Sequence, residues 1–301
     1  MLAGSTNHTF LSGRLNLTFN DNGEVTAYSG QPVLLENSLA EDEDILNELE
    51  IYRPEVDRVN NLTAGALQVT LDGSTASCRH EECNFGNLIT DAFVLYMANQ
   101  SAESWTNAPI GIANGGTIRT TITPYPSKSV SRGELLAALP FGNQVVSLKI
   151  KGKDLVQTLE LGIRSDGETS YGEFLQVSGL RVVYDRSKPP MSRVVSVKSR
   201  CGNCDVPIYK DINLSMNYTI ILQDFLADGN DGHYILKENT FDRISTDLGD
   251  VDVTQWYIQN YNPAFAEIQG RISFVTDGEV QIFSSKKLLF IALSCLTLNM
   301  F

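Results

Sequence analysis

Residues 112–120 read IANGGTIRT, an apolar run that ends in a double glycine and is followed by an arginine. The letters before it extend the run to APIGIAN (108–114), which is typical of the buried end of a β-strand. Because glycine adopts backbone conformations that other residues avoid, the double glycine allows a tight turn directly after the strand. Ligand sites favour loops at strand ends, so we expect Asn114 and Arg119 to lie at such a site.

The segments on either side of this strand alternate between helical and strand patterns. Apolar residues from Phe85 to Met97 recur along one face of a helix, and LQVTLDG (67–73) predicts a strand before it. Beyond the glycine turn, residues 134–163 predict a short helix, a strand and a second helix, and residues 175–222 are mostly strands. The pattern predicts the α/β (α+β) class, with mixed strands and flanking helices.

The first sixty residues follow a different pattern. Residues 13–35 alternate apolar and polar letters around Asp21-Asn22-Gly23, which predicts a β-hairpin. In the acidic stretch that follows, apolar residues from Ile45 to Val59 recur at helical spacing. We interpret residues 39–63 as a linker helix with a kink at Pro54.

The composition is that of a globular protein, with 42% hydrophobic and 20% charged residues among 301. The formal net charge of −13 is spread along the chain, and a negative field of this kind repels polyanions. We therefore expect no nucleic-acid polymer as a partner. A small anionic ligand is still compatible with the sequence where a few arginines converge.

Four of the five cysteines form two close pairs, Cys78 with Cys83 and Cys201 with Cys204. Such pairs either form disulfides or together ligate zinc. Six N-x-S/T sequons point to the secretory pathway, where disulfides persist, so we favour disulfides over a zinc site. The sequon asparagines, which we expect to be glycosylated, are Asn7, Asn16, Asn61, Asn99, Asn213 and Asn217.

The two ends of the chain lead to opposite expectations. Residues 276–301 have the layout of a GPI-attachment signal, in which a polar spacer precedes an apolar tail too short to span a bilayer. Asp277-Gly278 or Ser284-Ser285 would be the attachment site, and a buried C-terminal segment is the alternative reading. The N-terminus lacks the pattern of a signal peptide. We therefore expect the chain to be the C-terminal part of a longer protein, a splice form or a degenerate copy.

The sequence holds no preassembled catalytic motif. Its three histidines are isolated, which argues against a metal site, and no GxSxG, Walker or GxGxxG segment occurs. We therefore expect no catalytic residue and no metal ligand in this chain.

The remaining candidates are those of a binding site. Arg79, inside the first cysteine loop, and Arg119 can capture a carboxylate or a phosphate. Phe141 and Phe225 each start a glycine-containing loop and can clamp a flat base between them. Asp231 can accept hydrogen bonds from ribose hydroxyls. Taken singly, each has a plainer role as surface charge, core or turn.

Five segments, in this order, carry a resemblance to a known family. They are LDGSTASCRHEECNFGNLITDAF (71–93), IANGGTIRT (112–120), LPFGNQVVSLKIKG (139–152), GEFLQVSGLRVVYD (172–185) and FLADGNDGHY (225–234). Together they resemble the C-terminal domain of the ecto-5′-nucleotidase/apyrase family, from about Gly13 to Arg271. The C-terminal tail resembles that of the anchored ecto-5′-nucleotidases more than that of the secreted apyrases.

The resemblance implies that catalysis and substrate binding are carried by two different domains. In this family an N-terminal metallophosphatase domain holds two divalent metals, usually zinc, and the catalytic residues. The C-terminal domain is a layered sandwich of mixed sheets that supplies the nucleotide pocket. We accordingly assign residues 1–38 to the last hairpin of the metal domain, 39–63 to the linker helix, 64–275 to the substrate-binding domain and 276–301 to the anchor signal. With nearly all of the metal domain missing, the chain alone is expected to bind no metal and to be inactive.

The motifs also carry over the family's substrate contacts, position by position. The resulting set is Arg79, Asn114, Gly116, Arg119, Phe141, Phe225 and Asp231. The two phenylalanines resemble the pair that sandwiches the base, and the aspartate resembles the one that binds the ribose. Two positions depart from the family pattern. Thr117 replaces a glycine and is expected to crowd the loop, and Asp224 replaces an asparagine and adds negative charge.

The resulting hypothesis is the substrate-binding part of a 5′-nucleotidase that hydrolyses extracellular AMP to adenosine and phosphate. It would lie on the extracellular face of the plasma membrane through a GPI anchor, or be secreted, and a homodimer is compatible with it. Three alternatives stay open: a non-catalytic surface module that binds a nucleotide or nucleoside, an apyrase-type hydrolase, and a degenerate copy with no ligand.

Overall fold

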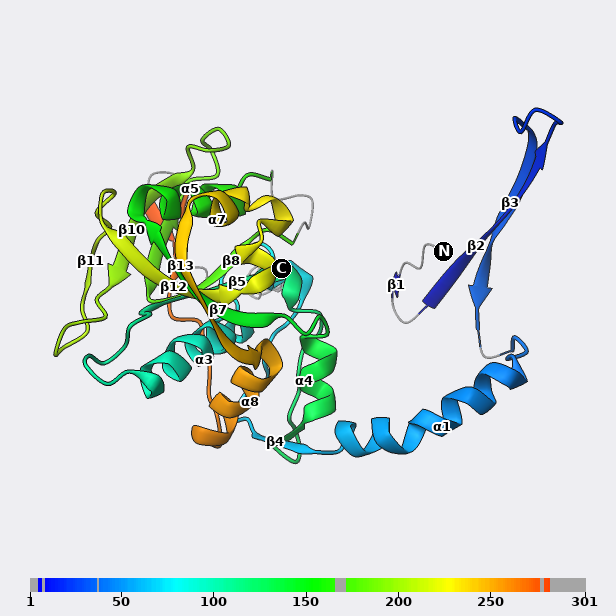
Figure 1. The fold of residues 1–301 in the computed structure, drawn as a ribbon, viewed down its shortest axis with the longest axis horizontal. Coiled ribbons are helices and arrows are strands. Elements are labelled where there is room, and N and C mark those ends of the chain that lie inside the picture. Colours follow the sequence, from blue (N-terminus) through cyan, green and yellow to red (C-terminus); the bar gives the residue numbers. More distant parts are fainter. Residues whose placement is uncertain (1–4, 7–8, 37, 166–171, 277–278, 282–301) are drawn as a thin grey trace, which may run out of the picture. The chain divides into compact units, whose positions relative to one another are not determined.

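The computed structural model describes residues 5–6, 9–36, 38–165, 172–276 and 279–281, and the chain divides into two compact units, residues 1–58 and 59–301 (Figure 1). In the first unit, β2 (Thr9–Phe19) pairs antiparallel with β3 (Val25–Leu35), and the short β1 (Ser5–Thr6) adds to the edge of β2. Gly23 adopts a φ of +80° in the intervening turn, as expected for the hairpin predicted at residues 13–35.

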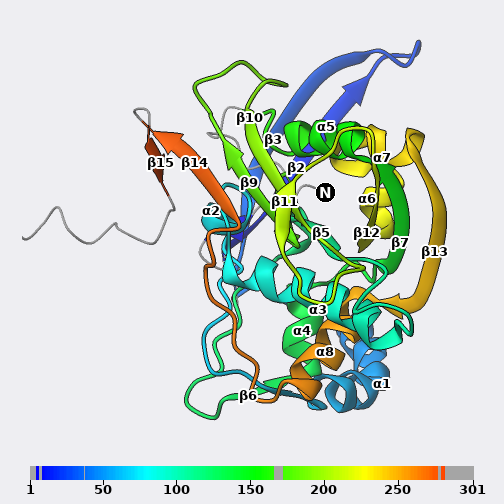
Figure 2. The ribbon, with the colours of Figure 1, turned by 90° about the vertical axis from the view of Figure 1, so that its left-hand side faces the viewer.

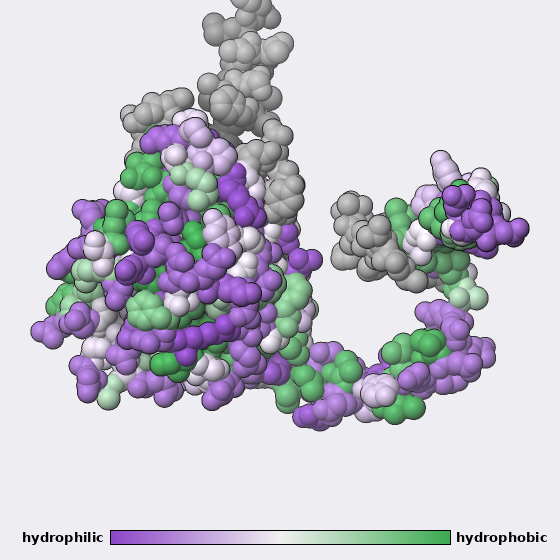
Figure 3. All heavy atoms as spheres, turned by 45° about the horizontal axis from the view of Figure 1, so that its top comes forward, coloured by the Kyte–Doolittle hydropathy of each residue, from purple (hydrophilic) through white to green (hydrophobic). Residues whose placement is uncertain are grey.

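Helix α1 (Glu43–Asn60) follows the hairpin and has no buried residue. The helix continues through Pro54, so the proline does not end it. The hairpin is equally open, and Leu15 and Tyr28 are 63% and 80% exposed. Figure 3 shows apolar side chains in green beside polar side chains in purple along both elements.

The second unit is built around a central mixed sheet. Its strands lie in the order β13-β7-β12-β5-β8, where β12 runs parallel to β5 and the other neighbours are antiparallel. Alternate side chains point to opposite faces, so Ile220 and Leu222 of β12 enter one core and Ile221 enters the other. The bounds are β5 (Ile110–Asn114), β7 (Gln144–Lys151), β8 (Leu175–Ser178), β12 (Asn217–Gln223) and β13 (Thr240–Gly249).

Helices cover both faces of this sheet (Figures 1 and 2). The core on one face includes residues of α2 (Thr75–Cys78), α3 (Asn84–Gln100), α4 (Arg132–Ala138) and α8 (Asp250–Asn260), together with the small ladder of β4 (Thr63–Ala66) and β6 (Ser129–Ser131). The core on the other face includes residues of α5 (Gly152–Gly162), α6 (Asp224–Ala227) and α7 (Tyr234–Glu238).

A second mixed sheet shares that other core. Its order is β11-β10-β9-β14-β15, and only β9 and β14 run parallel (Figure 2). Tyr184 at the end of β9 is buried with its ring 5.8 Å from that of Phe274. The bounds are β9 (Leu180–Tyr184), β10 (Val194–Arg200), β11 (Tyr209–Asp211), β14 (Ile272–Thr276) and β15 (Glu279–Gln281). Two mixed sheets with flanking helices confirm the predicted fold class.

The predicted strand at residues 67–73 is wrong. Strand β4 ends at Ala66, and beyond it only single bridges form, between Leu67 and Ala264 and between Leu71 and Ile122. The backbone groups of this segment bond to several separate loops instead of one neighbouring strand, so an apolar and polar alternation did not produce a ladder.

Several terminal predictions fall outside the described residues. They are the sequon at Asn7, both anchor attachment sites and the apolar tail from Leu288 to Phe301. Within the described ranges, no helix combines the length and the apolar character that a bilayer crossing requires.

Candidate functional site

Four loop regions and the end of β5 converge on one cavity of about 450 Å³. All seven residues predicted for the site line it, together with three that the sequence analysis had not assigned there. The ten are Arg79, Asn114, Gly116, Thr117, Arg119, Phe141, Asn143, Gly172, Phe225 and Asp231. The three additional residues lie within the motifs quoted above. Thr117 directly follows Gly116, Asn143 lies two residues after Phe141, and Gly172 begins the GEFLQV segment.

The double glycine is required by a close approach of two loops. It forms the short 3-10 helix η1 (Gly115–Thr117) directly after β5. The Gly116 N–H donates to the carbonyl oxygen of Gly172 at 3.0 Å. A Cβ on Gly116 would lie 2.7 Å from the Gly172 Cα, closer than carbon atoms can pack. The glycine therefore keeps this wall of the cavity closed.

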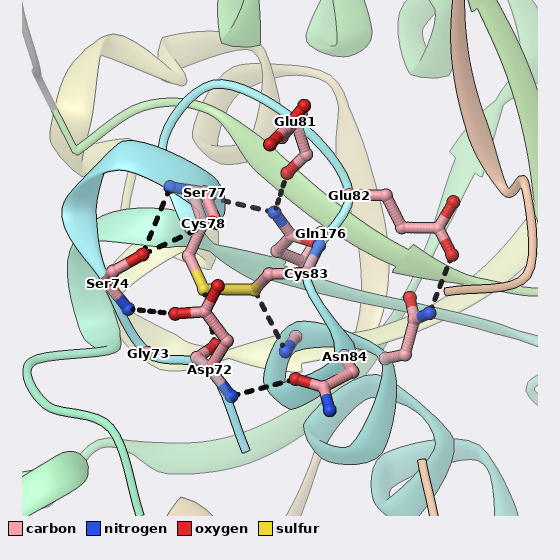
Figure 4. Close-up of a disulfide and its surroundings, with 12 residues drawn as sticks. Asp72, Gly73, Ser74, Ser77, Cys78, Glu81, Glu82, Cys83, Asn84 and Gln176 are labelled. Atoms are coloured by element: carbon pink, nitrogen blue, oxygen red, sulfur yellow. Dashed lines mark hydrogen bonds between the residues drawn. A yellow bond between two sulfur atoms is a disulfide. The ribbon is translucent and has the colours of Figure 1, made fainter. Parts of the chain in front are cut away.

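Arg79 is held by the disulfide loop that follows α2. Cys78 and Cys83 are joined by a disulfide and are both buried. Gln176 on β8 donates to the Cys78 carbonyl at 2.9 Å and accepts from the Cys83 N–H at 3.0 Å (Figure 4). The loop is thus fixed to the central sheet at both of its ends. The second predicted pair, Cys201 and Cys204, is also disulfide-bonded, outside the cavity lining.

Two guanidinium groups share the cavity. Burial, followed by repulsion from Arg119, lowers the pKa of Arg79 from its ordinary value, and the carboxylates of Asp231 and Glu173 oppose this shift. The Arg119 guanidinium lies 5.7 Å from the centre of the Phe141 ring. An anion bound beside both arginines would relieve their mutual repulsion, so the local charge favours an anionic ligand although the whole chain is negative.

Asp231 lies in the 3-10 helix η2 (Asn230–Gly232), where it adopts a φ of +51°. Its carboxylate accepts a 2.7 Å hydrogen bond from the side-chain amide of Asn114, which is 2% exposed. His233, two residues after Asp231, is fully buried, and its Nε2 lies 2.9 Å from the Glu173 carbonyl oxygen. Burial lowers the pKa of His233 to about 4, so the ring is neutral at neutral pH.

The two aromatic rings of the cavity are accessible to different degrees. Phe141 is 57% exposed in the turn before β7, and Phe225 is half-buried in the first turn of α6. Neither ring is sealed in a core. They reach the cavity from different loops, and both line it.

The two departures from the family motifs are accommodated locally. The Asp224 carboxylate accepts from the backbone N–H groups of Gln144 and Phe225, at 3.1 and 2.8 Å, and the residue is not part of the cavity lining. The Asp224 carboxylate is therefore stabilised by backbone N–H groups. Thr117 is buried, and its hydroxyl accepts a 2.7 Å hydrogen bond from Gln223.

The described residues do not offer a site for the metals that the resemblance implies. Across the described ranges, no group of three or more His, Cys, Asp or Glu side chains is placed to hold an ion. The sequon residues Asn16, Asn61, Asn99, Asn213 and Asn217 are all exposed, and their glycosylation stays a prediction.

Comparisons with known proteins agree with the fold. A family model described as the 5′-nucleotidase C-terminal domain matches residues 51–238. The chain is 37% identical over 266 residues to Protein 5NUC of Lutzomyia longipalpis, covering 87% of this chain and 46% of that protein. It is 36% identical over 265 residues to the 5′-nucleotidase of Homo sapiens, covering 88% and 46%.

A solved structure is also similar to this chain. The crystal structure of a 5′-nucleotidase precursor from Thermus thermophilus superimposes with a TM-score of 0.67 at 32% identity, over 88% of this chain and 50% of that one. The chain thus spans about half the length of the relatives described here.

Proposed function

Because the chain belongs to the 5′-nucleotidase C-terminal domain family, we propose that its cavity binds a nucleoside monophosphate such as AMP. In this proposal the chain is the substrate-recognition part of a 5′-nucleotidase. The observation that carries it is the convergence of two aromatic rings, two guanidinium groups and a carboxylate around one cavity.

Each part of the nucleotide has a chemically matched partner. The base stacks between Phe141 and Phe225, and the phosphate lies toward the guanidinium groups of Arg79 and Arg119. The ribose hydroxyls donate to Asp231, whose carboxylate is already oriented by Asn114. The cavity volume of about 450 Å³ suits a ligand of this size.

The proposal assigns recognition, and not bond cleavage, to these residues. Hydrolysis of a phosphate monoester needs an activated water and a group that stabilises charge on the phosphoryl oxygens. Among the described residues, no group of three or more His, Cys, Asp or Glu side chains is placed to hold a metal ion. We expect the full chain as printed to show no metal-dependent hydrolysis of AMP, and clear turnover would contradict this assignment.

The cellular setting stays a prediction from the sequence. The exposed sequons and the two disulfides support an extracellular location. Attachment through a GPI anchor and a homodimeric state are part of the same proposal.

The test is calorimetric titration of the full chain with AMP and with adenosine. We expect AMP to bind at least about tenfold more tightly, because hydrogen bonds to a charged group contribute roughly 1.5–3 kcal/mol. Phe225→Ala should weaken both ligands by about 1–3 kcal/mol of lost stacking. Phe265→Ala is the matched control, because this phenylalanine is 53% exposed and lies outside the cavity lining. Absence of binding, or equal affinities of the two variants, would refute the proposed clamp.

A further inference from the structure

A carboxylate buried behind the cavity takes no part in the contacts proposed above. Asp250 begins helix α8 and is 0% exposed. It is not itself in the cavity lining, but one of its partners, Asn143, is. Among the described residues it forms no ion pair, although buried carboxylates are normally neutralised by a cation. Its environment consists of amide groups.

Asp250 is tied to Asn143 through both the backbone and the side chain. The Asp250 N–H donates to the Asn143 carbonyl oxygen at 2.9 Å. Its Oδ2 accepts from Gln223 Nε2 at 2.8 Å and from Asn143 Nδ2 at 3.5 Å. Gln223 is itself fully buried, so the carboxylate cannot move without breaking this arrangement.

The same two amides contact the hydroxyl of Thr117. Its Oγ1 accepts from Gln223 Nε2 at 2.7 Å and from Asn143 Nδ2 at 3.5 Å. The amino group of Asn143 therefore has two acceptors on its buried side. Both acceptor positions of the Thr117 hydroxyl oxygen are occupied, so the hydroxyl proton can donate to another group. Thr117 also lines the cavity.

The charge on Asp250 decides which end of the Asn143 amide points inward. A carboxylate can only accept, so it selects the amino end of the amide and leaves the carbonyl oxygen for the cavity. Burial raises the pKa of Asp250 to about 6, with Asp224 adding to the shift and the hydrogen bonds from Gln223, Val251 and Asn143 opposing it. The group is still mostly ionised at neutral pH.

We propose that Asp250 is a positioning residue that holds the Asn143 side chain with its oxygen toward the base, so that the site prefers bases with an exocyclic amine. This inference rests on the proposed nucleotide site. An amine such as that of adenine donates to the Asn143 oxygen, whereas the carbonyl of hypoxanthine meets it with a second acceptor. Asn143 lies two residues after Phe141, in the turn that carries one ring of the clamp.

The experiment compares AMP with IMP, which differ at the amine and carbonyl of the six-membered ring. Calorimetric titration of the full chain at pH 7.5 should give about fivefold to tenfold tighter binding of AMP, the range expected for one hydrogen bond. Asn143→Ala should reduce this ratio to about one. Asp250→Asn should also reduce it, because an amide at this position can donate and no longer selects the amino end of Asn143.

Two controls separate positioning from general damage. Asp252→Asn removes a carboxylate from the same helical turn, where it pairs with Arg132 at the surface, and should keep the wild-type ratio. Loss of folding would weaken both nucleotides alike and leave their ratio unchanged, so the ratio reports on selectivity.

The outcomes are distinguishable. Equal affinity of the wild-type chain for AMP and IMP, or a wild-type ratio in Asn143→Ala or Asp250→Asn, overturns this inference and leaves the proposed nucleotide site intact. Absence of binding of both nucleotides to the wild-type chain overturns the proposed function, and this inference with it.

Discussion

Replacing Gly116 with alanine adds one methyl group where two loops of the cavity wall meet. The new Cβ would lie 2.7 Å from the Gly172 Cα and 3.1 Å from the Asn114 side-chain nitrogen. An unstrained carbon–carbon contact needs about 3.5–4 Å, so the loops must separate by roughly 1 Å. The displaced atoms include the amide that orients Asp231.

The expected cost follows from these contacts. Forcing an extra methyl group into a packed site costs about 1–3 kcal/mol. Lengthening the 3.0 Å bond from Gly116 N–H to the Gly172 carbonyl removes roughly 1 kcal/mol more. We therefore expect Gly116→Ala to lose about 2–4 kcal/mol of unfolding free energy, and AMP affinity to fall at least about tenfold.

Urea denaturation and calorimetric titration with AMP measure the two effects. Gly13→Ala is the matched control, because a Cβ at that strand position meets no atom within 4 Å. Alanine there should be neutral or slightly stabilising. A Gly116→Ala chain that stays within about 0.5 kcal/mol of the wild-type chain in both measurements would show that the two loops do not need a glycine at this position.

Three further predictions concern the parts that hold the cavity. Arg119→Gln should reduce the preference for AMP over adenosine by about tenfold in calorimetric titration, because one charged partner of the phosphate is lost; an unchanged preference would place the phosphate elsewhere. Replacing Cys78 and Cys83 together with alanine should weaken AMP binding by freeing the loop of Arg79, whereas the same change at Cys201 and Cys204 should not. His233 has a pKa of about 4 in the folded chain against 6.5 unfolded, so the unfolded state binds the proton more tightly and stability is lost as pH falls from about 6.5 to 4. The stability advantage of the wild-type chain over His233→Gln in urea denaturation should therefore shrink by up to about 3 kcal/mol across that range, and a gap independent of pH would contradict the assignment.

Local patterns were enough to predict much of the fold. The apolar face from Phe85 to Met97 became helix α3, and APIGIAN became the buried strand β5 that delivers the glycine turn to the cavity. Both segments have strong, regular periodicity within one element. The strand prediction for LQVTLDG was wrong because the alternation of apolar and polar residues is short. The backbone partners of this segment come from several distant loops, which no local pattern encodes.

The candidate site could likewise be predicted only in part from local sequence patterns. Motif resemblance located seven of the lining residues, because each stands within a recognisable sequence segment. The network behind them could not be predicted, since Asn143 and Asp250 are separated by 107 positions and meet only after β13 and β7 have paired. The direction of a side-chain amide depends on the charge and burial of that distant partner.

A crystal structure of the full chain bound to AMP would show directly how the cavity holds the nucleotide. We expect the purine to lie between the rings of Phe141 and Phe225, with the phosphate oxygens within hydrogen-bond distance of Arg79 or Arg119. A nucleotide bound at any other place, or a base that touches neither ring, would contradict it.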